Sequence, residues 1–506
     1  MWNKAAFLAA FLLSGAASAQ EPMSAIDWLS RSIEAPPVAP AAPWKEGDEA
    51  GVHTSEIEVT RLDRSPPDAA GLLASSVTGL PNSLWSASDA TTLSRLMQIA
   101  GRAELPAVRA LMYTLLLAEA DPPRAIPVSG DFLQLRVDQL LRLGAVEQAE
   151  ALLERAGPET PALFQRAFDA ALLTGNEDAR CADLDNRPEI QVRYPARIFC
   201  LARRGKWSTA ALVLGTAEAL GDLTPYEDAL LSKFLDPDVY EEDDPLEYPE
   251  EPTPLEYRLF EAIGERMPTA PLPRAFSFVD LRPVAGWKAQ LEAAERLAAA
   301  GALSENRLLG IYSARLPAAS GGVWDRVEAL QRFDTALSRR DKQAIMRTIR
   351  PAWQAMAEVN LQVPFARLYG PSLLTVNLIG AHQDLASEIA LLSAAYEEAA
   401  RAIDPVTSTD SMLIAAATGR LPDTPPVQAR LRAIYDGFQQ LPSTEFQQLI
   451  KDGALGEVIL RAIGKLANGT NSDPRQVAEA LALFRAVGLE ETARTVALQL
   501  ILLPTD

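Results

Sequence analysis

The chain has 506 residues, of which 48% are hydrophobic and 23% are charged, proportions that are ordinary for a folded protein. Its formal net charge is −20, and an acidic surface repels phosphate backbones and anionic lipid head groups, so nucleic-acid binding is disfavoured. A chain of this length exceeds one compact core, so we expect two or three domains or one extended repeat array.

The chain begins with the three parts of a secretory signal peptide. Lys4 gives a positive start, residues 5–13 form an unbroken apolar run, and Ala17-Ser18-Ala19 is a small-residue cleavage site. The apolar run is too short to span a membrane, and no later segment is long enough to do so. We therefore expect a signal peptide at 1–19 and a soluble periplasmic protein with no membrane span.

The next two segments differ in pattern. Residues 20–54 are rich in Pro and Ala and are predicted to be a flexible leader, because they contain too little apolar surface to order themselves. Residues 55–63 alternate polar and apolar side chains, which is the only clear strand signal in the chain.

From Ser86 onward, apolar residues recur at steps of three and four, which predicts amphipathic helices. One junction recurs at Gly144, Gly175 and Gly205, where a Gly ends one helix and an Ala follows one turn into the next. A related junction occurs at Gly488. Gly adopts the left-handed conformation that caps a helix, and a period near 30 residues holds two helices with their turns. This pattern predicts the stacked helix pairs of a solenoid.

Two repeat units carry this pattern most clearly, LeuArgLeuGly followed by Ala149 and AlaArgArgGly followed by Ala210. On these residues, the segment from Phe132 to Gly221 resembles tetratricopeptide-type (TPR) repeats. The Pro-rich leader and the GlyLeuLeu…LeuTrp segment, Gly71 to Trp85, also resemble exported bacterial helical-repeat proteins of uncharacterised function. The resemblance implies an all-α fold, a helical-repeat α-solenoid of TPR-like helix pairs, and it implies no activity.

The only two cysteines, Cys181 and Cys200, predict one disulfide, because an even count in an exported chain is typical of a bridge. If residues 176–184 and 192–203 form antiparallel neighbours, the two thiols come within bridging range. The bridge would close a loop of about 20 residues and stabilise the fold by roughly 3 kcal/mol. The alternative is a pair of buried free thiols.

An acidic, proline-rich stretch interrupts the helices. Residues 234–257 contain ten carboxylates and five prolines but no Lys or Arg, and a helix cannot persist through them. We expect a solvated docking loop for a basic partner surface, with the carboxylates of Asp236, Asp238, Glu241, Glu242, Asp243 and Asp244. Calcium binding is the open alternative, although the glycine at the sixth position of an EF-hand loop is absent.

A second Pro-rich break covers 268–284, and residues 404–426 form a further interruption. Between and beyond them, we expect helices at 287–300, 303–314, 324–337, 341–358, 383–402, 426–439, 444–451, 455–467, 474–486 and 489–502. The predicted domains are a helical-repeat domain with a short β segment at 55–235, an acidic Pro-rich linker at 236–284 and a C-terminal helical domain at 285–506.

No residue pattern predicts a catalytic, cofactor-binding or metal site. The only two histidines, His53 and His382, lie in unrelated regions without clustered ligands. LeuMetGln at 96–98 matches a fragment of the lytic transglycosylase motif, but no Glu precedes it to protonate a glycosidic oxygen. The chain also lacks a complete nucleotide-binding P-loop.

These observations favour a non-catalytic periplasmic scaffold or adaptor that needs no cofactor and binds a protein partner, one with a basic face, through the concave side of a solenoid. A flagellar motor or a secretion system is the kind of envelope machine in which such an adaptor works. The alternative is an enzyme acting on cell-wall glycan with an unrecognised active site.

Overall fold

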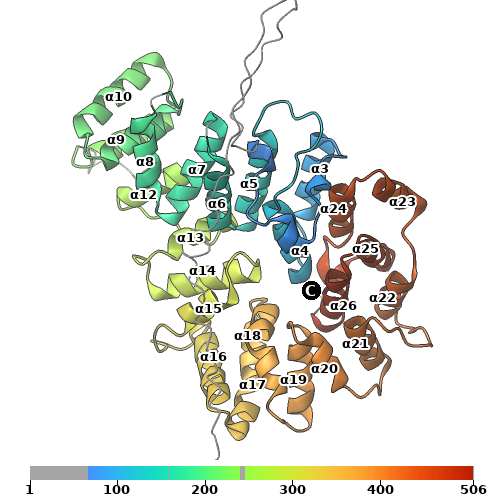
Figure 1. The fold of residues 1–506 in the computed structure, drawn as a ribbon. Helices are drawn as coiled ribbons and strands as arrows, with labels where there is room; N and C mark the ends of the chain where they lie inside the picture. Colours follow the sequence, from blue (N-terminus) through green and yellow to red (C-terminus); the bar gives the residue numbers. More distant parts are fainter. Residues whose placement is uncertain (1–65, 159, 188, 240–244, 505–506) are drawn as a thin grey trace, which may run out of the picture. The chain divides into compact units, whose positions relative to one another are not determined.

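The computed structural model describes residues 66–158, 160–187, 189–239 and 245–504, which form 25 α-helices and no β-strand (Figure 1). The predicted all-α class is confirmed for these residues. The predicted signal peptide, the leader and the β segment at 55–63 lie outside them. In the described part, no helix is long and apolar enough to cross a bilayer.

Contacts divide the chain into one unit at Met1–Leu62 and a second at Asp63–Asp506, which contains all the described residues. The predicted division of the helices by a linker at 236–284 stays a prediction. The first helices of the second unit are η1 (Pro67–Ala69), α2 (Ser75–Thr78), η2 (Asn82–Leu84), α3 (Ala90–Ala100), α4 (Pro106–Leu117), α5 (Asp131–Leu143), α6 (Val146–Ala156), α7 (Pro161–Thr174), α8 (Glu177–Asn186), α9 (Tyr194–Arg203), α10 (Trp207–Leu220), α11 (Pro225–Leu235) and α12 (Pro254–Ala262).

The remaining helices follow the acidic segment. They are η3 (Arg274–Phe276), α13 (Ser277–Asp280), α14 (Trp287–Ala299), α15 (Glu305–Tyr312), α16 (Val323–Ser338), α17 (Lys342–Ala357), α18 (Gln362–Leu374), α19 (Ala381–Leu391), α20 (Tyr396–Arg401), α21 (Ser408–Thr418), α22 (Ala429–Gln439), α23 (Thr444–Lys451), α24 (Leu455–Lys465), η4 (Gly469–Asn471), α25 (Pro474–Ala486) and α26 (Glu490–Leu502).

Helix ends follow from local chemistry. Gly144 takes a left-handed backbone (φ 87°), and the N–H groups of Gly144 and Ala145 donate to the last carbonyls of α5, at Leu141 and Leu140. Helices α11 and α12 each begin with a Thr-Pro pair, at Thr224 and Thr253, whose hydroxyl accepts a hydrogen bond from the N–H of the third helical residue. The sequence therefore turns the chain at defined points, and neighbouring helices such as α6 and α7, α9 and α10, and α16 and α17 pack as pairs.

Some of the helices and interruptions differ from those predicted. Helix α21 lies inside the predicted interruption at 404–426, because Thr407 and Asp410 form a capping box and start a helix rather than a loop. Helix α18 was not predicted, since Pro364 and Pro371 lie within its sequence. The single helix predicted at 383–402 is two helices, α19 and α20, separated by a short turn.

Helices from the two ends of the described chain pack against each other. Figure 1 shows α3 and α4 beside α24 and α26, and these helices are in direct contact. Trp85 is fully buried there, and a Cβ added to Gly456 of α24 would lie 2.4 Å from its ring. The N–H of Ala107 donates to Oε1 of Gln499 at 2.9 Å. Close approach at Gly456 therefore joins segments that lie far apart in the sequence.

A buried arginine fixes the first described residues. The Arg136 side chain of α5 is fully buried, and its guanidinium donates to the carbonyls of Ala70, Leu116 and Ala118 at 2.7–2.9 Å. Asp68 accepts from the N–H groups at the start of α5, at Gly130 and Leu133. Burial lowers the pKa of Arg136 to about 10, although the charge of Asp68 opposes this shift.

Alanine substitutions at two helical glycines test this packing, and we expect them to change the free energy of unfolding in opposite directions. We expect Gly456→Ala to lower the free energy of unfolding by about 1–3 kcal/mol, because the new methyl group meets Trp85 and the Leu84 carbonyl. In Gly215→Ala of α10, the new methyl group meets no atom within 4 Å, so this substitution should raise the free energy of unfolding by about 0.5–1 kcal/mol. Urea unfolding of the two variants measures both. Equal effects of the two substitutions would contradict the close contact at Gly456.

Candidate functional site

A cavity of about 800 Å³ opens among helices α9 to α12. Phe199, Trp207 and Phe234 form its aromatic wall, with ring centroids 5.9 Å apart for Phe199 and Phe234 and 6.1 Å apart for Trp207 and Phe234. Trp207 is 49% exposed, and Val284, which also lines the cavity, is 79% exposed. The cavity thus presents aromatic and aliphatic surface to solvent.

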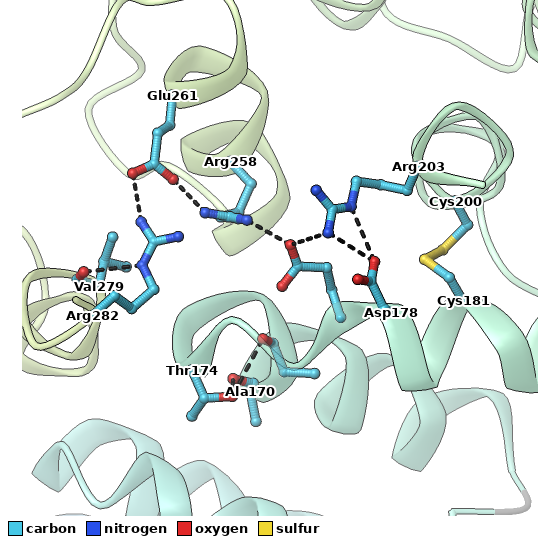
Figure 2. A network of polar contacts seen from close by, with 12 residues as sticks. Ala170, Thr174, Asp178, Cys181, Cys200, Arg203, Arg258, Glu261, Val279 and Arg282 are labelled. Atoms are coloured by element: carbon cyan, nitrogen blue, oxygen red, sulfur yellow. Dashed lines mark hydrogen bonds and ion pairs between the residues drawn. A yellow bond between two sulfur atoms is a disulfide. The ribbon is translucent and has the colours of Figure 1, made fainter. Parts of the chain in front are cut away.

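An ion-pair network forms the polar side of the same cavity (Figure 2). Glu177 is 1% exposed and accepts from Nη2 of Arg258 at 2.5 Å, while Nη2 of Arg203 lies 3.5 Å away. Arg258 also pairs with Glu261, which accepts from Nη2 of Arg282 at 2.5 Å. Burial raises the pKa of Glu261, but the Arg282 hydrogen bond and the neighbouring guanidinium charges outweigh it and hold the pKa below its usual value. The network ties α8, α9 and α12 to the segment after α13.

A disulfide joins Cys181 of α8 to Cys200 of α9, the pairing predicted from the sequence. Their Cα atoms are 5.0 Å apart, and both residues are buried. Figure 2 shows the bridge beside Asp178 and Arg203, which are themselves paired at 2.8 Å. The covalent link therefore fixes α9, which supplies Phe199 and Arg203 to the cavity wall.

Removing the bridge should destabilise the fold. The double variant Cys181→Ser, Cys200→Ser loses the constraint on a loop with a sequence separation of 19, which we expect to cost about 3 kcal/mol of unfolding free energy. Urea unfolding of the oxidised protein with and without reductant provides the matched comparison. Two alkylatable thiols in denatured, unreduced protein would contradict the bridge.

The predicted docking loop is described in part. Asp236 and Asp238 are exposed, and neither forms an ion pair with a described residue, while Glu241, Glu242, Asp243 and Asp244 lie outside the described residues. The carboxylates that follow, Glu247, Glu250 and Glu251, are exposed and likewise unpaired within the described part. Asp236 directly follows α11, and Pro237 lines the aromatic cavity, so acidic groups border the apolar surface.

Helix α10 leaves most of its apolar surface open. Its sequence, WSTAALVLGTAEAL, contains one charged residue, yet only Ala210 and Ala217 are buried, on the side that packs against its neighbours. Leu212 is 71% exposed and Leu220 is 62% exposed. Figure 1 shows α10 beside α9 at the margin of the helices. Trp207, Leu212 and Leu220 lie around the open side of α10, and only Trp207 of the three lines the aromatic cavity. These side chains and the cavity are here named the α10 surface. It was not predicted from the sequence, although the run of apolar residues in α10 is visible there.

A second cavity, of about 470 Å³, is lined by a carboxyl group whose pKa is raised. Asp169 of α7 accepts a hydrogen bond from Nε2 of Gln165 at 2.9 Å. The neighbouring Arg166 pairs instead with Asp138, with Nε of Arg166 2.5 Å from Oδ1 of Asp138. Burial raises the pKa of Asp169 to about 6, with a further contribution from the charge of Asp138. The other two carboxylates on this wall, Glu227 and Glu256, cap α11 and α12.

The raised pKa of Asp169 makes the stability of the fold depend on pH. Between pH 3.8 and about 6 the folded state holds a proton that the unfolded chain releases, so this group makes stability fall as the pH rises. Above pH 6, Asp169→Asn should therefore be more stable than the wild type by up to about 3 kcal/mol, and the difference should vanish below pH 3.8. Thermal unfolding across this pH range measures it, and a difference independent of pH would contradict the assignment.

His382 lies at the start of α19 and is half-buried, while His53 lies outside the described residues. Among the described residues, no group of three His, Cys, Asp or Glu side chains is placed to hold a metal ion. No protein-family model, curated protein or solved structure matches the chain. Function is therefore inferred from the surfaces described above.

Proposed function

We propose that the protein is a non-catalytic scaffold or adaptor of the periplasm that binds a partner protein through its helical array. We further propose that its helix pairs form a TPR-like solenoid and that the α10 surface is the docking site. The observation that carries the proposal is the exposure of Trp207, Leu212 and Leu220 on one helix next to an open aromatic cavity. Grouped exposed apolar side chains are typical of protein interaction sites.

The acidic segment after α11 indicates the kind of partner. Asp236 and Asp238 flank the cavity residue Pro237, and Glu247, Glu250 and Glu251 follow further along the segment. All five are exposed and make no ion pair with described residues. A partner that places Lys or Arg opposite them and an apolar side chain against Trp207 would match both features. Such association weakens as salt screens the charges, while the apolar contact remains.

Two leucine substitutions test this docking site. We expect Leu212→Glu to reduce capture of the partner from crosslinked envelope extract at least about tenfold, because it places a charge on the apolar contact. Leu441→Glu is the matched control, since Leu441 is 82% exposed but lies between α22 and α23. Neither variant should alter thermal unfolding. Equal capture by both variants, or no partner at low or high salt, would contradict the proposal.

Cell-wall glycan hydrolysis is a second candidate, and one observation favours it. The carboxyl of Asp169 lines a cavity with a pKa raised to about 6, and an acid that holds its proton near neutral pH can protonate a glycosidic oxygen. Turnover of peptidoglycan by the purified protein, abolished in Asp169→Asn, would support this function over the scaffold. Under the scaffold proposal, the same variant changes only stability.

A further inference from the structure

A cavity of about 300 Å³ lies where distant parts of the chain meet, at α4, η3, α14, α18, η4 and the residues that follow α26. Figure 1 shows α4, α18 and α26 close together in this region. Three arginines line it: Arg109 of α4, Arg274 of η3 and Arg296 of α14. Glu104 is the only carboxylate among the lining residues, so the local charge is positive in a chain whose formal net charge is −20.

Two of these arginines are held by backbone carbonyls. Arg109 donates from Nε to the carbonyl of Ala103 at 2.8 Å and from Nη1 to that of Ala299 at 2.7 Å. Arg296 donates from Nη2 to the carbonyl of Leu272 at 2.6 Å, and from Nη1 to the carbonyl of Thr269 and to Oγ of Ser277, both at 3.1 Å. Because a guanidinium has five N–H donors, each of these groups retains donors beyond these contacts, and its direction is fixed.

Arg274 differs from the other two. Its guanidinium makes no hydrogen bond or ion pair with any described residue, although its aliphatic stem is packed. A Cβ built on Gly144 would lie 2.9 Å from Cγ of Arg274, so the left-handed glycine that ends α5 also leaves room for this side chain. Packing therefore explains the position of the aliphatic part of Arg274, but its guanidinium charge has no partner among the described residues.

The cavity arginines lack a carboxylate partner among the described residues. Some arginines elsewhere in the described part form ion pairs across helices, as Arg326 does with Glu295 at 2.7 Å. None of the three cavity arginines does so within the described residues. Burial lowers the pKa of Arg109 and that of Arg296, and the charge of Arg274 lowers both further. The three cations thus repel one another at partly buried positions, a cost that an anion would offset.

A buried neutral donor adds a second, independent feature. Gln362 of α18 lines the cavity and is 5% exposed, and its side-chain amide has no hydrogen-bond partner among the described residues. The amide of Gln362 is not fully enclosed by protein, so it can donate to an occupant of the cavity. An amide donor beside three guanidinium groups suits a ligand with several acceptor oxygens.

We propose that this cavity binds a small molecule through an oxyanion, a phosphate or carboxylate group held by Arg109, Arg274 and Arg296. Guanidinium groups bind both kinds of oxyanion through paired, charge-assisted hydrogen bonds. The volume of about 300 Å³ suits a small ligand rather than a macromolecule. Because the cavity lining does not overlap the α10 surface, the proposal does not depend on the scaffold function.

Calorimetric titration of the full chain with inorganic phosphate, and separately with citrate, tests the site. We expect saturable binding of at least one of these anions beyond that of chloride at equal ionic strength. Tighter binding of phosphate would identify a phosphorylated ligand, and tighter binding of citrate a carboxylate ligand. Arg274→Gln should weaken the binding at least about tenfold, because a charge-assisted contact is lost.

Arg95→Gln is the matched control. Arg95 is exposed in the middle of α3 and has no hydrogen bond or ion pair with a described residue, so binding should stay within about twofold of the wild type. Circular dichroism and thermal unfolding establish that both variants are folded, as expected from the lack of hydrogen bonds at Arg274. Binding no stronger than that of chloride, or equal binding by Arg274→Gln and wild type, would overturn the proposal.

Discussion

The packing of Trp85 against Gly456 is the contact on which the arrangement of the helices depends. It holds α24, near the end of the described chain, against the segment before α3, and the hydrogen bond from Ala107 to Gln499 reinforces the junction. Only a residue without a side chain permits this approach, because Trp85 and the carbonyl before it occupy the space of a Cβ. With both ends joined, the helix pairs between them have little freedom to rotate apart.

Two different kinds of site occur within this arrangement of helices. Where elements from distant segments converge, at Arg109, Arg274 and Arg296, the backbone brings like charges together and leaves a small cationic cavity. Helix α10 packs through Ala210 and Ala217, with Val213 and Leu214 partly buried, whereas Leu212 and Leu220 stay exposed. The first site suits a small anion, and the second suits a protein surface.

The sequence predicted what local chemistry determines. Helical periodicity, the left-handed turn at Gly144 and the pairing of Cys181 with Cys200 all depend on short stretches of chain. Helix α21 was missed because Thr407, which caps it, lies in a stretch typical of loops. The Trp85 contact and the cationic cavity could not be predicted, because they join residues more than 160 positions apart through packing alone. To predict the α10 surface, one would have to know which apolar face of α10 stays uncovered in the fold.

Site-specific photo-crosslinking in intact cells tests most directly whether a partner protein contacts α10. A photoreactive residue placed at Leu212, which is 71% exposed, should form one discrete adduct with another protein. The same residue at Leu441, which is 82% exposed, should form none. Mass spectrometry of the adduct would identify the partner and the residues it places against α10. No adduct at Leu212, or the same adducts at both positions, would contradict the claim.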